Sequence, residues 1–349
     1  PNSPPRLDAP GSGPLYMAMQ FLSDNAAPVH PRVWAALQAA DASDAPYDND
    51  ALSRSLDAAF SALFGRPCAA LWVASGTAAN SLALAALVDP HGAVICHREA
   101  HIENDECGAP TFFTHGALLM LADGPHARLA PEAIDALIGT IRRDVHRVWP
   151  QALSLTQASE AGTVYRPAEL AALGECARRH GLGLHVDGAR FANAVAFLGC
   201  TPAEAAGPAD ALSFGCIKNG AMGAEALLLF DPAKAELVRY RRKRAGHLQS
   251  KGRFLAAQLL AMLDGDLWLD NARAANDAAR ELAGAVADRL LHPVEANEVF
   301  VRLSERERDA LRAAGFGFYD WGADGARFVT AWNARGQDVA ALARALAAL

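Results

Sequence analysis

Lys218 is the residue of this sequence whose type and surroundings point most directly to chemistry. It lies in an apolar, glycine-punctuated segment, 211–230, between stretches 212–214 and 226–230 that predict buried strands. A lysine amine that is partly desolvated in such a crossing has a lowered pKa and can attack a carbonyl carbon to form a Schiff base. A lysine that points to water from a loop tip is the alternative, and this segment alone does not decide between the two.

Asp187 ends a short apolar strand and is followed by a glycine. A helix and a strand fit between Asp187 and Lys218, so we expect the aspartate at the carboxyl edge of a parallel sheet, where α/β sheets bind ligands. A Schiff-base lysine, with an aspartate that keeps a pyridine nitrogen protonated, is the protein side of pyridoxal phosphate chemistry. A lone strand-end aspartate is more often a helix cap, so it is the pair that favours this chemistry.

Ser75, Gly76 and Thr77 follow another buried strand and open an apolar helix. Backbone N–H groups and hydroxyls at a helix N-terminus bind phosphate well, because the helix dipole favours negative charge. Helix capping by Ser75 alone is the alternative interpretation. His101 follows the next strand, 93–96, at the same edge of the sheet, where an imidazole could stack on a cofactor ring.

Composition limits the classes of function. The chain has 349 residues, of which 52% are hydrophobic and 20% charged, enough for two domains. Its net charge of −7, with one basic run at 239–244, argues against a nucleic-acid partner. We find no membrane span and no secretory signal. The six cysteines lack CxxC spacing, so we expect reduced, buried residues of a cytoplasmic protein and no metal site.

The pattern of elements predicts two domains. Residues 1–19 are rich in Pro, Gly and Ser, which indicates a flexible extension. Strands then alternate with helices, so we expect a large domain at 20–245, with its segment 20–45 near the active site. Residues 246–349 resemble a small α+β domain. Around and within it we expect helices at 232–263, 266–291 and 337–349, and strands at 298–303, 315–319 and 326–331.

Five motifs together resemble those of the threonine aldolases, a branch of the fold-type I pyridoxal phosphate enzymes that includes β-eliminating lyases. They are Phe21-Leu-Ser-Asp-Asn25, Ser75-Gly-Thr-Ala-Ala-Asn80, Leu184-His-Val-Asp-Gly-Ala-Arg190, the Lys218 segment, and Ala326-Arg-Phe-Val-Thr-Ala-Trp332. The resemblance runs from about residue 20 to the end of the chain. It implies an α/β fold with a mostly parallel sheet in the large domain, and a homotetramer with active sites at dimer interfaces.

The resemblance implies a role for each cofactor-binding residue. Lys218 would bind the cofactor's aldehyde carbon, and Asp187 would pair with the pyridine nitrogen. Gly76 and Thr77 would hold the phosphate, beside Ser75. His101 would stack on the ring of pyridoxal 5′-phosphate.

On the substrate side, the resemblance implies that Ser23 and Arg327 hold the carboxylate. Arg190 would support either the ring oxygen of the cofactor or that same carboxylate. His146 is similar to the family histidine that reaches the β-hydroxyl. Each of these residues also has a structural alternative. Arg327 could be a strand residue whose aliphatic stem covers apolar surface, and Arg190 could simply form an ion pair with Asp187. His146 could be an ordinary surface residue.

The sequence departs from the common family pattern in three places. Ile217 replaces the Ser or Thr that many members carry before the lysine. Leu155-Thr-Gln-Ala-Ser159 replaces a Glu-Asn-Thr-His-Asn stretch, so Gln157 stands in for a cofactor contact. Lys251, in the glycine-bounded stretch 246–252, is a substitute for an arginine that often contributes to the phosphate site.

The resemblance implies retro-aldol cleavage of L-β-hydroxy-α-amino acids, such as L-threonine, L-allo-threonine or phenylserine, to glycine and an aldehyde. The expected partner is therefore a small amino acid. His146 or a bound water is the candidate base for the β-hydroxyl, with His101 as runner-up. A β-eliminating lyase or an aminotransferase on the same fold is one alternative, and a non-catalytic cofactor-binding homologue is another.

Overall fold

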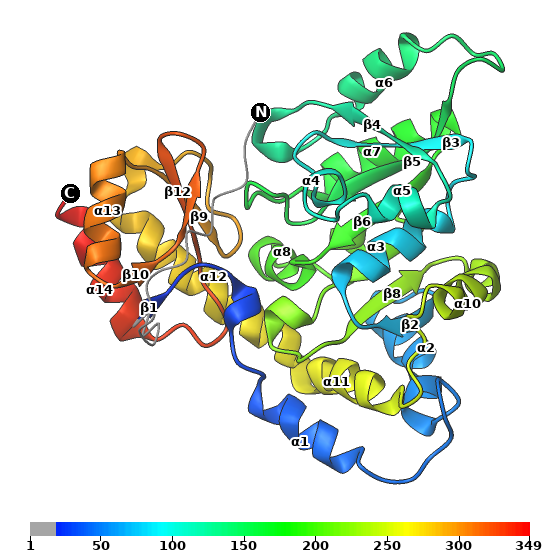
Figure 1. The fold of residues 1–349 in the computed structure, drawn as a ribbon, viewed down its shortest axis with the longest axis horizontal. Coiled ribbons are helices and arrows are strands. Elements are labelled where there is room, and N and C mark those ends of the chain that lie inside the picture. Colours follow the sequence, from blue (N-terminus) through cyan, green and yellow to red (C-terminus); the bar gives the residue numbers. More distant parts are fainter. Residues whose placement is uncertain (1–18) are drawn as a thin grey trace.

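The computed structural model describes residues 19–349, so the extension expected at residues 1–19 lies, apart from Met19, outside the described residues. Figure 1 shows a large sheet covered by helices, with a smaller helix-and-sheet unit beside it. The predicted α/β class with a mostly parallel large sheet is therefore confirmed. In this described part, every helix is too short or too polar to span a bilayer.

The large sheet has seven strands in the order β2-β8-β7-β6-β5-β3-β4. All neighbouring strands run parallel except where β8 pairs with β2 and β7. Most of these strands are continuous buried apolar runs, as a parallel sheet with helices on both faces requires. The strands are β2 (Ala69–Val73), β3 (Gly92–His97), β4 (Leu118–Ala122), β5 (Trp149–Thr156), β6 (Gly183–Gly188), β7 (Ala211–Phe214) and β8 (Glu225–Leu229).

The helices around this sheet follow clear local signals. Helix α2 (Ala51–Phe64) begins after Asp50, whose carboxylate accepts a hydrogen bond from the Ser53 N–H, and ends at Gly65 with φ of 62°. Its buried side chains recur at helical spacing. The other helices of this region are α1 (Pro31–Ala39), α3 (Gly76–Ala85), α4 (His101–Asn104), α5 (Ala109–Phe113), α6 (Pro131–Gly139), α7 (Pro167–His180), α8 (Phe191–Leu198), α9 (Pro202–Ala206) and α10 (Ala235–Arg244).

The prediction of a single long helix at 232–263 is wrong. A loop separates two helices there, α10 and α11 (Arg253–Leu263). Gly246 adopts φ of 79°, which ends α10. At Gly252 a Cβ atom would overlap the carbonyl oxygen of Tyr47, so only glycine permits this close approach. The intervening segment pairs with the loop before α2, since the Tyr47 N–H donates to the carbonyl of Ser250 at 2.8 Å.

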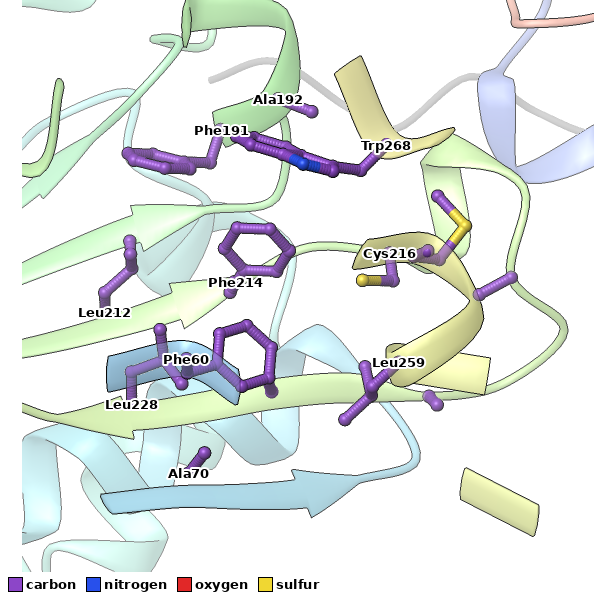
Figure 2. Packing of buried hydrophobic residues seen from close by; sticks show 14 of the residues in the cluster. Phe60, Ala70, Phe191, Ala192, Leu212, Phe214, Cys216, Leu228, Leu259 and Trp268 are labelled. Carbon is purple, nitrogen blue, oxygen red and sulfur yellow. The ribbon is translucent and has the colours of Figure 1, made fainter. Parts of the chain in front are cut away.

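Helix α11 packs in the core of the large sheet, although the sequence placed it beyond the expected boundary at residue 245. Figure 2 shows Leu259 of α11 and Trp268 beside Phe60 and Phe214. The ring centroids of Phe214 lie 5.3 Å from those of Phe60 and 5.4 Å from those of Trp268. The division into domains at residue 245 stays a prediction, but α11 shares the hydrophobic core of the residues before it.

Helix α12 (Leu267–Ala285) connects the large sheet to the smaller unit and is shorter than the expected 266–291. The smaller unit contains a three-stranded antiparallel sheet in the order β11-β12-β9. The stretch expected as one strand at 315–319 is divided between β10 and β11. The elements are β9 (Glu298–Arg302), α13 (Glu305–Ala313), β10 (Phe316–Gly317), β11 (Tyr319–Trp321), β12 (Gly325–Val329) and α14 (Gly336–Ala347).

The N-terminal segment crosses from the large sheet to the smaller unit. Strand β1 (Met19–Gln20) pairs in parallel with β10, and the carbonyl of Phe21 accepts a hydrogen bond from the Val329 N–H at 2.9 Å. Phe21 itself is buried among the apolar residues of this unit. The segment that follows, with Ser23, is thereby held next to β12, which carries Arg327.

Four of the six cysteines are buried, whereas Cys200 is half-buried and Cys107 is exposed. The expectation of buried cysteines therefore holds for Cys68, Cys96, Cys176 and Cys216. The expected cytoplasmic location stays a prediction.

Candidate active site

Lys218 lies in a short helical turn, η3 (Ile217–Asn219), in the crossing between β7 and β8. Two hydrogen bonds to helix α12 hold this turn in place. The side-chain amide of Asn219 donates to the backbone carbonyl of Trp268, and the side-chain amide of Asn271 donates to the backbone carbonyl of Asn219, both at 2.8 Å. Gly220, at φ of 114°, turns the chain back toward β8. The half-buried lysine is therefore presented from a rigid loop and not from a mobile tip.

Asp187 lies at the carboxyl end of β6 and is 3% exposed. Its Oδ1 accepts a hydrogen bond from the Ala189 N–H at 3.0 Å, and its Oδ2 accepts one from the Asn80 amide at 2.8 Å. These two bonds fix the orientation of the carboxylate while leaving lone pairs on both oxygens. The pair expected from the sequence does converge, since Asp187 and Lys218 line one cavity of about 250 Å³.

The N-terminus of α3 forms another wall of this cavity through Ser75, Gly76 and Thr77. The Ser75 hydroxyl caps the helix by accepting from the Ala78 N–H at 3.2 Å. Capping and anion binding are compatible here, because a capped helix still presents its first N–H groups and its positive dipole end. A Cβ at Gly76 would meet nothing within 4 Å, so the space beside this turn is open.

His101, at the start of α4, also lines the cavity and is held by a buried carboxylate. Its Nδ1–H donates to Oε1 of Glu106 at 2.9 Å, and this hydrogen bond raises the pKa of His101 above its ordinary value although burial lowers it. Asn80 donates to Glu106 and to Asp187, each at 2.8 Å. The amide of Asn80 therefore links Glu106, which holds His101, to Asp187, the residue expected at the pyridine nitrogen.

A second cavity, of about 510 Å³, lies beside the first and is lined by Ser23 and Arg327. Asn25, His101, Glu160, Arg190 and Lys218 line both cavities. The guanidinium of Arg327 lies over the rings of Tyr319 and Trp321, 5.5 and 5.8 Å from their centroids. The two cavities therefore form one continuous site that runs from α3 to β12.

Arg190 belongs to a chain of charged side chains beside the two cavities, in which the two carboxylates are buried and the two arginines are half-buried. Its guanidinium donates to both oxygens of Asp24, at 2.8 and 3.0 Å, and lies 3.3 Å from Glu298. Arg327 is the next member, 3.7 Å from the same Glu298 carboxylate. The simple pair of Arg190 with Asp187 is therefore wrong, since its ion-pair partners are Asp24 and Glu298.

The charges in this chain shift the pKa values of Asp24 and Arg190. Burial raises the pKa of Asp24, but the charges of Arg190 and Lys218 outweigh burial and hold that pKa below its ordinary value. The pKa of Arg190 is raised, because the carboxylates of Asp24 and Glu298 outweigh its burial. Arg190 is therefore a permanent cation with two fixed partners, which suits a supporting role more than direct capture of a substrate carboxylate.

Three predicted residues do not reach the cavities in the described chain. Gln157 is fully buried, and its amide bonds to the backbone of Tyr165 and Ala205 and not toward the cavity, so its cofactor contact stays a prediction. His146 is exposed in the loop between α6 and β5. Lys251 is exposed and pairs by its backbone with Tyr47. Within one copy of the chain, these three assignments find no support.

Sequence reasoning missed the acids around the site, which are the buried Asp24, Glu106, Glu225 and Glu298 and the half-buried Glu160. Asp24 lies inside the motif Phe21-Leu-Ser-Asp-Asn25, so the motif itself was the signal that could have identified it. Glu106 and Glu160 lie in loops, whereas Glu225 and Glu298 lie in strands, and only the fold brings these four acids together.

The residues present fit pyridoxal 5′-phosphate. Lysine, an anion-binding helix N-terminus and a buried carboxylate surround one cavity, and these are the groups that the aldehyde, phosphate and pyridine nitrogen of that cofactor require. Buried polar atoms without a partner in the described chain also gather here, as expected of a site built for a polar ligand. They include Asn80 Oδ1, Glu106 Oε2, Glu160 Oε2 and Arg327 Nε.

Comparison with known proteins gives consistent matches. Residues 20–306 match the model of the family described as beta-eliminating lyase. The chain is 47% identical over 333 residues to a low specificity L-threonine aldolase of Pseudomonas aeruginosa, covering 93% of this chain and 96% of that protein. It is 43% identical over 340 residues to a low specificity L-threonine aldolase of a Pseudomonas species, covering 94% and 98%.

A solved structure agrees with these matches in fold. The structure of a threonine aldolase of Leishmania major superimposes with a TM-score of 0.89 at 25% identity, covering 94% of this chain and 98% of that one. A solved methionine aminotransferase of Escherichia coli, at a TM-score of 0.69 and 16% identity, shares the fold alone.

Proposed function

The chain belongs to the beta-eliminating lyase family, and from this we propose that it cleaves L-β-hydroxy-α-amino acids such as L-threonine to glycine and an aldehyde. The observation that carries the proposal is the continuous site in which Lys218 and Asp187 line one cavity and Arg327 lines the next. The identity of 47% over nearly the whole chain to a low specificity L-threonine aldolase supports the same activity.

The enzymes of this family depend on pyridoxal 5′-phosphate, which when bound withdraws the electron pair left on Cα as the Cα–Cβ bond breaks. Lys218 would hold the aldehyde carbon of this cofactor, and the N-terminus of α3, with Ser75, Gly76 and Thr77, would hold its phosphate. Asp187 would keep the proton on the pyridine nitrogen, since a carboxylate favours the charged form of a neighbouring cation.

The chain's own residues would orient the substrate. Arg327 would bind its carboxylate through two parallel N–H···O bonds, with Ser23 beside it, and so align the Cα–Cβ bond for cleavage. Asp24 and Glu298 hold Arg190 in the wall between the cavities, where its charge supports the same end of the substrate. Lys218 would supply the proton that the glycine Cα takes up before release.

The expected oligomer belongs to this proposal. We infer a homo-oligomer, as the family resemblance implies, with active sites at the contact between two copies. The homotetrameric state is an expectation that a measurement of molecular mass in solution would test.

The test of the function is to supply the cofactor-loaded protein with L-threonine and with L-phenylserine, and to measure aldehyde and glycine. We expect one glycine per aldehyde for at least one substrate. Lys218→Ala is the matched negative control, because it removes covalent catalysis and should lower the rate by several orders of magnitude. Pyruvate or another oxo acid in place of the aldehyde would instead support β-elimination or amino transfer, and no product at all would support a non-catalytic homologue.

A further inference from the structure

Glu160 is a half-buried residue with one buried carboxylate oxygen, and the proposed function so far gives it no role. It lies in the loop after β5, and its Oε1 accepts two hydrogen bonds. One comes from the Thr156 hydroxyl at 2.7 Å and the other from the backbone N–H of His101 at 3.0 Å. Its Oε2 is inaccessible to solvent and has no hydrogen-bond partner within residues 19–349. One oxygen is therefore fixed by two hydrogen bonds, while the other is buried without a hydrogen-bond partner in the described residues.

The location of Glu160 favours contact with the substrate. It lines both the cavity of Lys218 and the cavity of Arg327. Among the described residues shared by both cavities, it is the one carboxylate. Two of the other ionisable groups there have fixed partners: Nδ1 of His101 is bonded to Glu106, and Arg190 is bonded to Asp24. Lys218 is engaged by its expected cofactor role.

We propose that Glu160 is a catalytic residue that accepts the proton of the substrate β-hydroxyl through Oε2, an inference that rests on the proposed function. The O–H bond breaks and its electron pair forms the C=O bond of the aldehyde. The Cα–Cβ bond breaks, and its electron pair stays on the glycine Cα. That carbon then takes a proton from Lys218, and the proton held by Glu160 returns to Lys218 through water, so atoms and charges balance.

The environment of Glu160 suits proton exchange near neutral pH. Burial raises its pKa to about 7, and the negative charge of Asp187 adds to this effect, against the lowering by the bonds from Thr156 and the His101 N–H. A carboxylate in this range can accept a proton and release it again. The ionisable groups that face it from the surrounding elements are Cys96, His101, Tyr165, Asp187, Arg190 and Lys218.

This assignment replaces the histidine expected from the sequence. His146 lies exposed outside both cavities of its own chain, whereas Glu160 lines both of them. His101 has its Nδ1–H committed to Glu106, which favours a fixed ring over a proton acceptor at that atom. A structural role for Glu160 is the competing explanation, since its Oε1 also anchors the start of α4.

The decisive experiment compares two reactions of Glu160→Gln. Cleavage of L-threonine requires removal of the β-hydroxyl proton, whereas exchange of the glycine α-proton with solvent requires only Lys218 and the bound cofactor. We expect cleavage to fall by roughly 10²–10³-fold, the usual loss of a general base, while glycine exchange changes by less than about threefold. Glu103→Gln is the matched control, because Glu103 is exposed on the same short helix and lines neither cavity in the described chain.

A second measurement observes Glu160 without any turnover. Difference infrared spectra of the wild-type protein and Glu160→Gln, recorded without substrate, should contain one carboxyl group that titrates near pH 7. The difference is needed because burial also raises the pKa of Glu225 to about 7. We expect the wild-type cleavage rate to fall below this pH and the variant to lose that dependence.

The outcomes separate the explanations. An equal loss of cleavage and exchange in Glu160→Gln, retention of full cleavage, or absence of the titrating carboxyl would each overturn the role of Glu160. A wild-type protein that exchanges the glycine α-proton but cleaves neither substrate would contradict the proposed function instead.

Discussion

The carboxylate of Asp24 accepts two hydrogen bonds from the guanidinium of Arg190, at 2.8 and 3.0 Å. The two residues come from opposite parts of the fold, the N-terminal segment held by the smaller unit and the end of β6 in the large sheet. Asp24 is buried and Arg190 is largely buried, with its side chain 12% exposed, and the amide of Asn297 donates a further hydrogen bond to Asp24 at 2.9 Å. This pair therefore fastens the two units together at the wall of the active site.

Removal of one charge from this pair should destabilise the protein. We expect Asp24→Asn to lower the free energy of unfolding by about 3 kcal/mol at pH 7, the low end for a broken buried ion pair, because Glu298 still faces Arg190. Urea unfolding measures the difference. Asp41→Asn, at an exposed position, is the control and should change stability little. Equal effects of the two substitutions would contradict a special role of the Asp24–Arg190 pair.

The same pair predicts a dependence of stability on pH. The pKa of Asp24 is lower in the folded protein than in the unfolded chain, where it is near the ordinary 3.8. Its contribution is therefore fully present above that ordinary value and is lost as the pH falls through the folded pKa. The stability difference between the wild type and Asp24→Asn should shrink as the pH is lowered below about 4.

Glu106 should control the titration of His101. In Glu106→Gln the charged acceptor at Nδ1 is lost, so burial dominates and the pKa of His101 should fall. Nuclear magnetic resonance of ring-labelled histidine follows this shift directly, with Glu103→Gln as the exposed control on the same helix. An unchanged His101 pKa in Glu106→Gln would mean that the hydrogen bond does not form in solution.

The hydrogen bond between His101 and Glu106 should also make the stability of the protein depend on pH. The pKa of His101 in the folded protein lies above the ordinary 6.5. Its stabilising contribution is therefore present below about that pH and is lost as the pH rises through the folded value. The stability cost of Glu106→Gln should accordingly be larger in mildly acidic than in alkaline buffer.

The sequence predicted the central chemistry of the site because that chemistry depends on local order. Lys218 and Asp187 each follow a buried strand, and parallel strands bring their carboxyl ends to one edge of the sheet. The turn of Ser75 at a strand–helix junction is equally local. Patterns of this kind are readable from a single sequence, and the structure brings these residues to one cavity.

The remaining residues could not be predicted in this way because their partners are distant in the chain. Glu298 lies between Arg190 and Arg327 only because β9 pairs with β12 and faces the start of α8, where Arg190 lies. Gln157 follows its strand as a site residue would, yet its amide is taken up by the backbone of Tyr165. Strand order and side-chain direction at a strand end decide such cases, and the periodicity of the sequence does not report them.

Asp187 should be essential for cleavage but not for the fold. Asp187→Asn keeps the shape and loses the negative charge. Its one carbonyl oxygen can still accept the bond from the Ala189 N–H, whereas its NH2 group cannot accept the bond from the Asn80 amide. We expect the cofactor to bind and aldehyde formation to fall by at least ~100-fold, because the proton on the pyridine nitrogen is no longer held. Visible absorbance measures cofactor binding, and an aldehyde assay measures the rate. Near-full activity in this variant would make Asp187 a structural residue.

Arg327 is the residue that distinguishes a site for an amino acid substrate from a cavity that binds only the cofactor. It lies on β12, far in sequence from Lys218, and both side chains line the second cavity. Its Nε has no partner in the described chain, and Glu298 is 3.7 Å from its Nη1, so part of the guanidinium is free for a ligand. A substrate carboxylate could satisfy the free donors in a parallel, two-bond geometry.

Arg327→Lys should therefore bind the cofactor with unchanged visible absorbance and lose most of its activity. An ammonium is a point donor and cannot reproduce the planar guanidinium, so we expect kcat/KM for L-threonine to fall by roughly 10²-fold. The loss should be much smaller for the amino alcohol that lacks the carboxylate, measured as binding to the cofactor-loaded protein. Equal losses for both compounds, or a loss of cofactor binding, would show that Arg327 supports the fold and does not hold the substrate.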